Sequence, residues 1–286
     1  MGEAVLVTLD GATHDPDSPL LCADDMAAVR GDGIFETVLV RDGKPCTLEL
    51  HLARLSKSAE ALELPPPDLV KWRAAAQGAA KRWGTDADGM MRWVYSRGRE
   101  SGGEPTAFVT VAAVPERILR ARVDGVSAMT LDRGYSVEAA ASAPWLLLGA
   151  KTLSYATNMA AIRFAHRCGA DDVIYVSRER RVLEGPRSTV VIARGKTLVT
   201  PPTKFGILAG TTQRALFEVA EAKGYACEYA SLVPADLILA DGVWLLSSVT
   251  LAARVHTLDG LALPRPTLEK ELPALVDIAV AEVGSA

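Results

Sequence analysis

A strand-like run followed by a tight turn is the feature that most constrains how this chain folds. Residues 34–40 (Ile-Phe-Glu-Thr-Val-Leu-Val) are rich in β-branched and aromatic residues, which favour β-strands. The Asp42-Gly43 pair that follows is typical of the two-residue turn of a β-hairpin. Because a hairpin joins antiparallel strands, these residues predict an antiparallel sheet in the first third of the chain.

Helix-like segments accompany this sheet. Apolar residues at helical spacing predict a helix over residues 48–62, and the proline triplet at 65–67 ends it. Residues 68–83 predict a second helix, and two further strands are expected over 90–96 and 107–114. The pattern indicates an α+β unit in which helices lie against an antiparallel sheet.

The pattern weakens over residues 116–144, and the small residues at 139–144 are typical of a crossing loop. A length of 286 residues favours about two domains, which we place at residues 1–117 and 118–286. The second domain is expected to contain helices over 155–168, 212–223, 234–239 and 268–283, and strands over 172–177, 189–193, 197–200 and 243–247.

Charge and composition exclude several classes of protein. Hydrophobic residues make up 49% and charged residues 23%, as in ordinary globular proteins rather than disordered or fibrous ones. The 31 basic and 35 acidic residues give a net charge of −4 without a basic stripe, which argues against a nucleic-acid partner. No run of about 18 apolar residues predicts a membrane span, and the acidic start of the chain is unlike a secretory signal. We therefore expect a soluble, cytoplasmic protein.

Cysteines, histidines and glycine-rich motifs give no metal or nucleotide site. The cysteines lack C-x-x-C spacing, which is consistent with free thiols in a reducing compartment, and the histidines lack ligand spacing, so we expect no metal. The Gly31-Asp32-Gly33 triplet has Glu36 where a dinucleotide fingerprint needs its third glycine. Gly195-Lys196-Thr197 lacks the first glycine of a P-loop because position 190 is valine.

Three places remain that could carry chemistry. Thr211 and Thr212 precede an amphipathic segment, so they could bind an anion at a helix N-terminus or serve only as a helix cap. Lys151 follows an apolar run, where a lysine can become a nucleophile that forms a Schiff base, although a solvent-facing lysine is the ordinary alternative. Glu184 could hold a cationic ring nitrogen, or merely flank a turn.

Ordered motifs over most of the chain resemble those of the pyridoxal-phosphate enzymes of fold type IV, the class IV aminotransferase family. This family includes branched-chain and D-amino acid aminotransferases and aminodeoxychorismate lyases. The motifs are Arg30-Gly31-Asp32-Gly33-Ile34-Phe35-Glu36-Thr37, His51-Leu52-Ala53-Arg54-Leu55 and Leu258-Asp259-Gly260. The resemblance implies a smaller N-terminal α/β sandwich, a larger C-terminal domain with a barrel-like β core, a cofactor in the interdomain cleft, and a homodimer.

The resemblance also implies roles for individual residues. Lys151 would carry pyridoxal phosphate as a Schiff base and move the proton, and Glu184 would pair with the pyridine nitrogen. Further contacts would come from residues that bind the phosphate (Arg54, Thr211, Thr212 and Ser248), that pack on the ring (Leu208), that meet the phenolic oxygen (Tyr155) or that bind a substrate carboxylate (Arg92 and Arg97). The sequence departs from the family at Thr189, where relatives commonly have asparagine, and at Pro186-Arg187.

Several reactions fit this cofactor. The first motif and Ser96-Arg97-Gly98 look more like the lyases than like the branched-chain aminotransferases, so we favour a 4-amino-4-deoxychorismate lyase that forms 4-aminobenzoate and pyruvate in folate biosynthesis. The alternative is a D-amino acid or branched-chain aminotransferase, which would pass an amino group to a 2-oxo acid. A non-catalytic protein that keeps the fold for binding is a third hypothesis, against which Lys151 and Glu184 argue.

Overall fold

The computed structural model describes residues 4–284, which form two compact units. Unit 1 contains the chain up to Pro115, the segment Ala150–Tyr155 and the residues from Glu282 on, and unit 2 contains Glu116–Gly149 and Ala156–Ala281. The sequence predicts a single boundary, between residues 117 and 118, and does not anticipate the return of Ala150–Tyr155. This return assigns Lys151 to unit 1.

Unit 1 is built on an antiparallel sheet with the strand order β2-β1-β6-β5-β3-β4. Its elements are β1 (Val5–Thr8), β2 (Thr13–His14), α1 (Met26–Val29), β3 (Gly33–Arg41), β4 (Lys44–Pro45), α2 (Leu48–Ala61), α3 (Leu69–Trp83), β5 (Gly89–Ser96) and β6 (Thr106–Ala113). The predicted hairpin is confirmed, because β3 and β4 pair at Arg41 and Lys44. Asp42 and Gly43 have φ values of 51° and 69°, as this turn requires.

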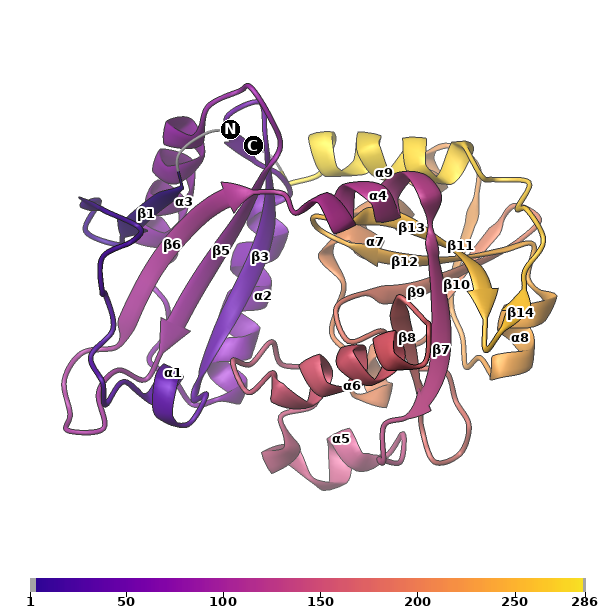
Figure 1. The fold of residues 1–286 in the computed structure, drawn as a ribbon, viewed down its shortest axis with the longest axis horizontal. Coiled ribbons are helices and arrows are strands. Elements are labelled where there is room, and N and C mark those ends of the chain that lie inside the picture. The colour runs from indigo at the N-terminus through magenta and orange to yellow at the C-terminus, as the bar shows by residue number, and fades with distance from the viewer. Residues whose placement is uncertain (1–3, 285–286) are drawn as a thin grey trace. The chain divides into compact units, whose positions relative to one another are not determined.

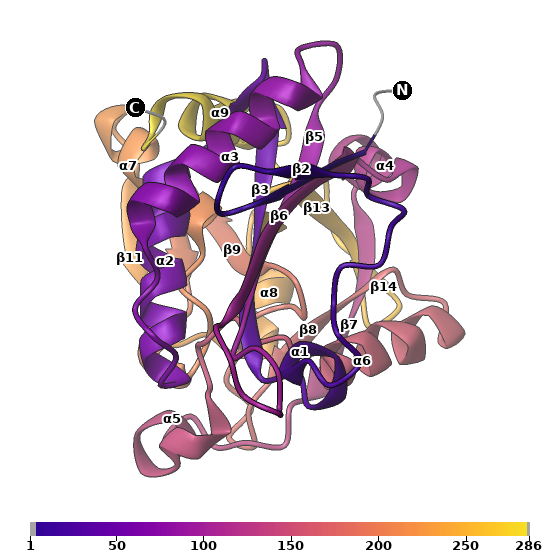
Figure 2. The same ribbon diagram turned by 90° about the vertical axis from the view of Figure 1, so that its left-hand side faces the viewer.

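Helices α2 and α3 cover one face of this sheet (Figure 2). Alternate residues of β3 and β5, such as Ile34 and Val38, or Met91 and Trp93, are fully buried, as a period of two demands when one face meets a core. Trp72 of α3 packs on Trp93 with ring centroids 5.6 Å apart. The predicted helices therefore bury their apolar faces against the predicted strands.

Unit 2 surrounds a mixed sheet with the order β11-β10-β9-β12-β13-β7-β8, and β14 pairs with β13 (Figure 1). Its strands are β7 (Val126–Asp132), β8 (Asp172–Val176), β9 (Thr189–Arg194), β10 (Thr197–Thr200), β11 (Ala226–Tyr229), β12 (Gly242–Ser247), β13 (Leu251–Leu258) and β14 (Leu261–Ala262). Its helices are α4 (Glu116–Asp124), α5 (Ala139–Ser142), η1 (Pro144–Leu146), α6 (Ala156–Arg167), η2 (Thr203–Phe205), α7 (Thr211–Ala222), α8 (Pro234–Leu239) and α9 (Glu271–Glu282).

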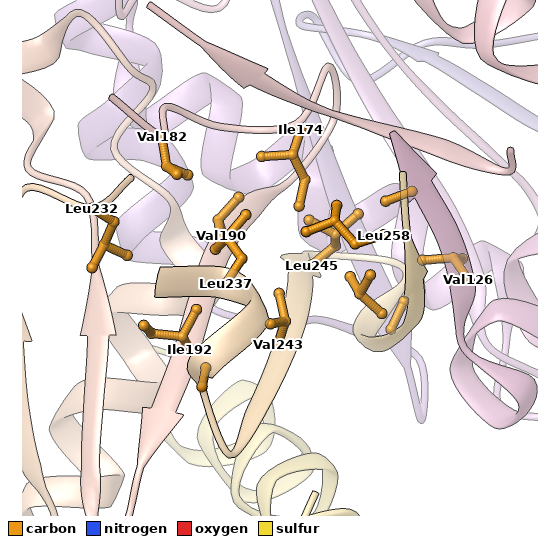
Figure 3. Packing of buried hydrophobic residues seen from close by; sticks show 14 of the residues in the cluster. Val126, Ile174, Val182, Val190, Ile192, Leu232, Leu237, Val243, Leu245 and Leu258 are labelled. Carbon is orange, nitrogen blue, oxygen red and sulfur yellow. The ribbon is translucent and has the colours of Figure 1, made fainter. Parts of the chain in front are cut away.

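Aliphatic side chains from these strands and from α8 form the core of unit 2 (Figure 3). Val190 and Ile192 of β9 meet Val243 and Leu245 of β12 there, and Leu237 of α8 packs on the same cluster. All five side chains are at most 2% exposed. The mixed α/β architecture of the two units confirms the predicted fold class, and no helix within the described chain is long and apolar enough to cross a membrane.

Several parts of unit 2 differ from the prediction, which did not include strands β11 and β14. Helix α4 and strand β7 lie in residues 116–144, where the sequence pattern is weak. The small-residue stretch 139–144 is not a plain loop, since Ala139–Ser142 forms one helical turn. Strand β13 was not predicted at all, because most of its side chains are buried and it therefore lacks the alternation that marks a half-exposed strand.

Candidate active site

Lys151 lies alongside the N-terminal end of β3 in unit 1. The Phe35 N–H donates to the Lys151 carbonyl oxygen at 3.0 Å, and Ile34 forms an antiparallel bridge with Thr152. The Lys151 N–H donates to the hydroxyl oxygen of Ser58 on α2 at 3.1 Å. The lysine backbone is thus held by both a strand and a helix, which fixes the point from which its side chain extends.

Two glycines in the motif at residues 30–37 permit this close approach. A Cβ on Gly33 would lie 2.8 Å from Cδ1 of Leu153, and the Leu153 N–H donates to the Gly33 carbonyl at 2.8 Å. Gly31 has a φ of +67°, and a Cβ there would lie 2.8 Å from the Ser154 hydroxyl. Only glycine fits such positions, so the motif brings the lysine-bearing segment against the sheet.

The ring of Phe35 lies beside the amine of Lys151. Its Nζ lies 4.4 Å from the ring centroid of Phe35, within the range of a cation–π contact. The Phe35 ring meets the Tyr155 ring edge-on, at 5.3 Å and 89°. In unit 1 the predicted residues Lys151 and Tyr155 therefore both contact the Phe35 ring.

The predicted phosphate ligand Arg54 is paired with a buried carboxylate. Its Nε and Nη2 donate to the two oxygens of Glu36 at 2.8 and 2.6 Å. His51, one turn earlier on α2, contacts Glu36 through Nδ1 at 2.7 Å. Since an ionised carboxylate only accepts hydrogen bonds, Nδ1 carries the proton. Glu36 and His51 are both fully buried, so they hold the Arg54 guanidinium in one orientation.

The charges of this cluster move the pKa values of its members. Burial by itself raises the pKa of Glu36, but Arg54 and His51 outweigh it and hold that pKa below the ordinary value. Burial lowers the pKa of His51, as do the charges of Arg54 and Lys151, against the opposing effect of Glu36. The cluster therefore consists of a carboxylate, a guanidinium and a neutral imidazole.

The two arginines predicted to meet substrate differ in their surroundings. The Arg97 guanidinium binds Asp32 at 2.7 Å and the Leu62 carbonyl oxygen at 2.7 Å. Arg92 is exposed on β5. Its partner in the register is Thr37, so Arg92 lies on the same face of the sheet as Phe35.

Glu184 is held in unit 2 through its backbone and through both of its carboxylate oxygens. Its backbone pairs with β8, because the Tyr175 N–H donates to the Glu184 carbonyl at 2.8 Å. One carboxylate oxygen accepts from Nη1 of Arg133 at 2.8 Å, and the other accepts from the Leu208 N–H at 3.0 Å. The side chain is only 12% exposed. The backbone of Leu208, whose side chain is predicted to lie on the cofactor ring, is therefore hydrogen-bonded to Glu184.

The N-terminus of α7 gathers the remaining predicted residues of unit 2. Gly210 is the N-cap, and no side chain caps the helix. Thr211 and Thr212 are buried in its first turn, and the Thr211 hydroxyl lies 3.4 Å from the hydroxyl of Ser248. Backbone N–H groups at a helix start, together with hydroxyl groups, are suited to an anion such as phosphate.

Thr189, which stands where the family commonly has asparagine, supports this helix start. It is buried, and a Cβ on Gly210 would collide with the Thr189 hydroxyl oxygen. Thr189 therefore packs against the backbone at the start of α7.

The predicted residues thus form one group within each unit. Lys151, Tyr155 and Arg54 belong to the group in unit 1, and the group in unit 2 contains Glu184, Leu208, Thr211, Thr212 and Ser248. The supporting positions of Glu36, His51 and Arg133 were not predicted from the sequence. Glu36 and His51 stand inside the recognised motifs, which was a usable signal, whereas Arg133 lies in the weakly patterned region. Residues 4–284 contain no cluster of three or more potential metal ligands among His, Cys, Asp and Glu side chains.

Known proteins of one family match most of this chain. The sequence model of class IV amino-transferases matches residues 33–258. A Mycobacterium tuberculosis protein named bifunctional aminodeoxychorismate lyase / D-amino acid transaminase is 56% identical over an alignment of 285 residues. The match covers 96% of this chain and 99% of the relative.

Solved structures agree with the sequence comparison. A hypothetical aminotransferase from Mycobacterium tuberculosis, in its PLP-bound form, superposes with a TM-score of 0.95 at 58% identity, and the match covers 97% of this chain and 98% of the other. A fold IV-transaminase from Curtobacterium pusillum gives a TM-score of 0.92 at 40% identity, covering 98% of this chain and 99% of the other. These matches confirm the resemblance that the motifs indicate.

Proposed function

Because the chain belongs to the class IV amino-transferase family, we propose that it is a 4-amino-4-deoxychorismate lyase. It would convert this substrate to 4-aminobenzoate and pyruvate, a step of folate biosynthesis. The observation that carries the proposal is the similarity, over nearly the whole chain, to a relative whose name includes aminodeoxychorismate lyase.

The cofactor is pyridoxal phosphate, in agreement with the family and with the PLP-bound relative. The polar groups in each unit fit this molecule. The uncapped start of α7 with its buried hydroxyl groups suits the phosphate, and the buried Glu184 carboxylate suits a protonated ring nitrogen. A lysine amine beside an aromatic ring is available to bind the aldehyde.

Each predicted residue has a role in this proposal. Lys151 holds the cofactor through Nζ, and Glu184 binds the pyridine nitrogen. The other proposed contacts are Arg54, Thr211, Thr212 and Ser248 on the phosphate, Leu208 on the ring, and Tyr155 on the phenolic oxygen.

When bound, the cofactor withdraws electrons and makes a C–H bond next to the substrate amine acidic. When it is free of the cofactor, the Lys151 amine would take the proton from this carbon of the substrate ring. Enolpyruvate would leave and take up a proton to become pyruvate, and the ring would become aromatic. Aromatisation makes the reaction strongly downhill without a second amino acid. For the substrate carboxylate we favour Arg92, because the Arg97 guanidinium is bonded to Asp32 and to backbone carbonyl groups.

A D-amino acid transaminase is the second candidate, and the same relative supports it because its name includes both activities. In this reaction Lys151 would move a proton from the α-carbon of the amino acid to the cofactor. A 2-oxo acid would then accept the amino group. A branched-chain aminotransferase would use the same residues on a different amino acid.

A substrate panel distinguishes the candidates. We expect the purified protein, loaded with pyridoxal phosphate, to release pyruvate from aminodeoxychorismate without a 2-oxo acid, and Lys151→Ala to release none. Absence of pyruvate together with ready turnover of D-alanine and 2-oxoglutarate would overturn the lyase and favour the transaminase. A protein that stays colourless with added cofactor would instead support a non-catalytic binding role.

We further propose that the protein is a cytoplasmic homodimer. Members of fold type IV are generally dimers, as the motif resemblance implies. Trp145 is the strongest candidate for the contact because its side chain is 75% exposed on the single chain.

A further inference from the structure

Arg133 is an unassigned residue in direct contact with Glu184. It follows β7, and its Nη1 donates to Oε1 of Glu184 at 2.8 Å. The two side chains are 18% and 12% exposed, so water screens the pair far less than it would at the surface. The Leu208 N–H binds the other carboxylate oxygen, and donors on both oxygens prevent the group from rotating freely.

Arg133 is itself held in place. Its guanidinium carbon lies 5.4 Å from the centroid of the Tyr175 ring. The backbone N–H of Arg133 donates to the Val176 carbonyl oxygen at 2.9 Å. The Tyr175 hydroxyl donates to Asn158 Oδ1 at 3.2 Å, and the Asn158 amide donates to the Pro186 carbonyl at 3.1 Å. These contacts link Arg133 to β8, which precedes Glu184, and, through Tyr175 and Asn158, to Pro186, which follows it.

We propose that Arg133 is a positioning residue that keeps Glu184 ionised and oriented to bind the protonated pyridine nitrogen of the cofactor. The inference rests on the proposed function of Glu184. A buried carboxylate without a charged partner is costly, so without Arg133 the group would take up a proton or turn away. Either change removes the acceptor that a pyridinium N–H needs. Arg133 touches neither the cofactor nor the substrate in this account.

The test compares two cofactors that differ only at the ring nitrogen. Apoprotein is titrated with pyridoxal phosphate and with its 1-deaza analogue, in which a C–H group replaces this nitrogen. Both carry the same phosphate and the same aldehyde for Lys151. We expect Arg133→Met to weaken binding of pyridoxal phosphate about 10-fold, the range of a lost hydrogen bond to a charged group. Binding of the analogue should be nearly unchanged.

Three variants complete the design. Arg133→Lys keeps the positive charge and should retain most of the preference for pyridoxal phosphate over the analogue. In a Glu184→Gln background, Arg133→Met should not change this preference further, because the residue through which it acts is already altered. Arg194→Met removes a guanidinium of the same unit that pairs with Asp236 at 2.6 Å, and it should behave as the wild type.

The outcomes separate the inference from the proposed function. Equal losses for both cofactors in Arg133→Met, or no loss for either, would overturn the positioning role while leaving Glu184 as the pyridine partner. A wild-type protein that binds neither cofactor would overturn the proposed function and this inference with it.

Discussion

Glu36 shows how one buried carboxylate can organise a binding residue. It accepts hydrogen bonds from Arg54 and His51 with atom separations between 2.6 and 2.8 Å. Bidentate pairing with a carboxylate fixes the plane of a guanidinium. The arginine that we propose for phosphate binding is therefore oriented before any ligand arrives, which reduces the entropy lost on binding.

Replacing Glu36 with glutamine should destabilise the protein strongly. The substitution leaves Arg54 as a buried cation without its carboxylate partner, and breaking a buried pair in this way costs about 3–5 kcal/mol. The free energy of unfolding, measured with urea at pH 7, checks this expectation. Glu49→Gln on α2 is the matched control, because Glu49 pairs with Arg73 in a similarly short contact of 2.8 Å but is 42% exposed. A loss no larger than that of the control would contradict the expectation.

The same substitution should change how stability depends on pH. The pKa of Glu36 is lower in the folded protein than its ordinary 4.5, so the unfolded chain binds this proton more readily. Its contribution is therefore present above pH 4.5 and is lost as the pH falls further. The lowered pKa of His51 acts in the same direction, from its ordinary 6.5 downward. As the pH is lowered from 7 to 3, the free energy of unfolding should fall less steeply for Glu36→Gln than for the wild type.

Elements whose signals are local were predicted well from the sequence. The hairpin turn follows from Asp42-Gly43, and α3 begins at Leu69 because the Asp68 carboxylate accepts from two N–H groups of its first turn. Strand β13 was missed because it lies between β12 and β7, so that burial of both faces removes the alternation. An element's signal therefore fades when its surroundings, rather than its own sequence, determine which side chains are buried.

Gly33 allows β3 to approach both β5 and the segment that carries Lys151, and a larger residue there tests whether the fold needs this approach. In Gly33→Ala the new methyl group would lie 2.7 Å from the Tyr95 carbonyl oxygen and 2.8 Å from Leu153. The backbone of β5 or the segment that carries Lys151 must therefore move. We expect a loss of about 1–3 kcal/mol in the free energy of unfolding, as for other overpacked sites, together with weaker retention of pyridoxal phosphate on gel filtration.

Gly78→Ala is the matched control for this substitution. Gly78 lies inside α3, and its Cβ would approach only the flexible end of Arg82. Alanine is favoured over glycine within a helix, so this variant should gain about 0.5–1 kcal/mol. If both variants had the same stability, the close approach at Gly33 would not limit the fold.

At the scale of the whole molecule, the candidate site residues were predicted from ordered motifs rather than from periodicity. The motifs identified Lys151 and Glu184, whose roles are proposals that the experiments above test. The pattern along the sequence assigned Lys151 to the second domain. Periodicity could not reveal its place in unit 1, because the pairing of residues 150–155 with β3 joins segments more than 100 residues apart in sequence. Arg133 was missed for a similar reason, since its contact with Glu184 spans 51 positions.

Assembly is the remaining property at this scale. The side chain of Trp145 is 75% exposed on the single chain, and it lies in η1 next to Leu146 and Leu147. Tryptophan is enriched among the residues that contribute most to binding at protein interfaces. We expect the wild-type protein to sediment at twice the mass of one chain, and Trp145→Ser to shift the protein toward the monomer at low micromolar concentration.

Val70 provides the control for this experiment. Its side chain is similarly exposed, at 73%, but it lies on α3 of unit 1, far from Trp145 in the sequence. Val70→Ser should leave the sedimenting mass unchanged, and far-ultraviolet circular dichroism should show that both variants remain folded. A Trp145→Ser protein that stays dimeric would exclude Trp145 as a required contact. A monomeric wild type would instead contradict the homodimer itself, because mass action would then leave no assembly for the substitution to weaken.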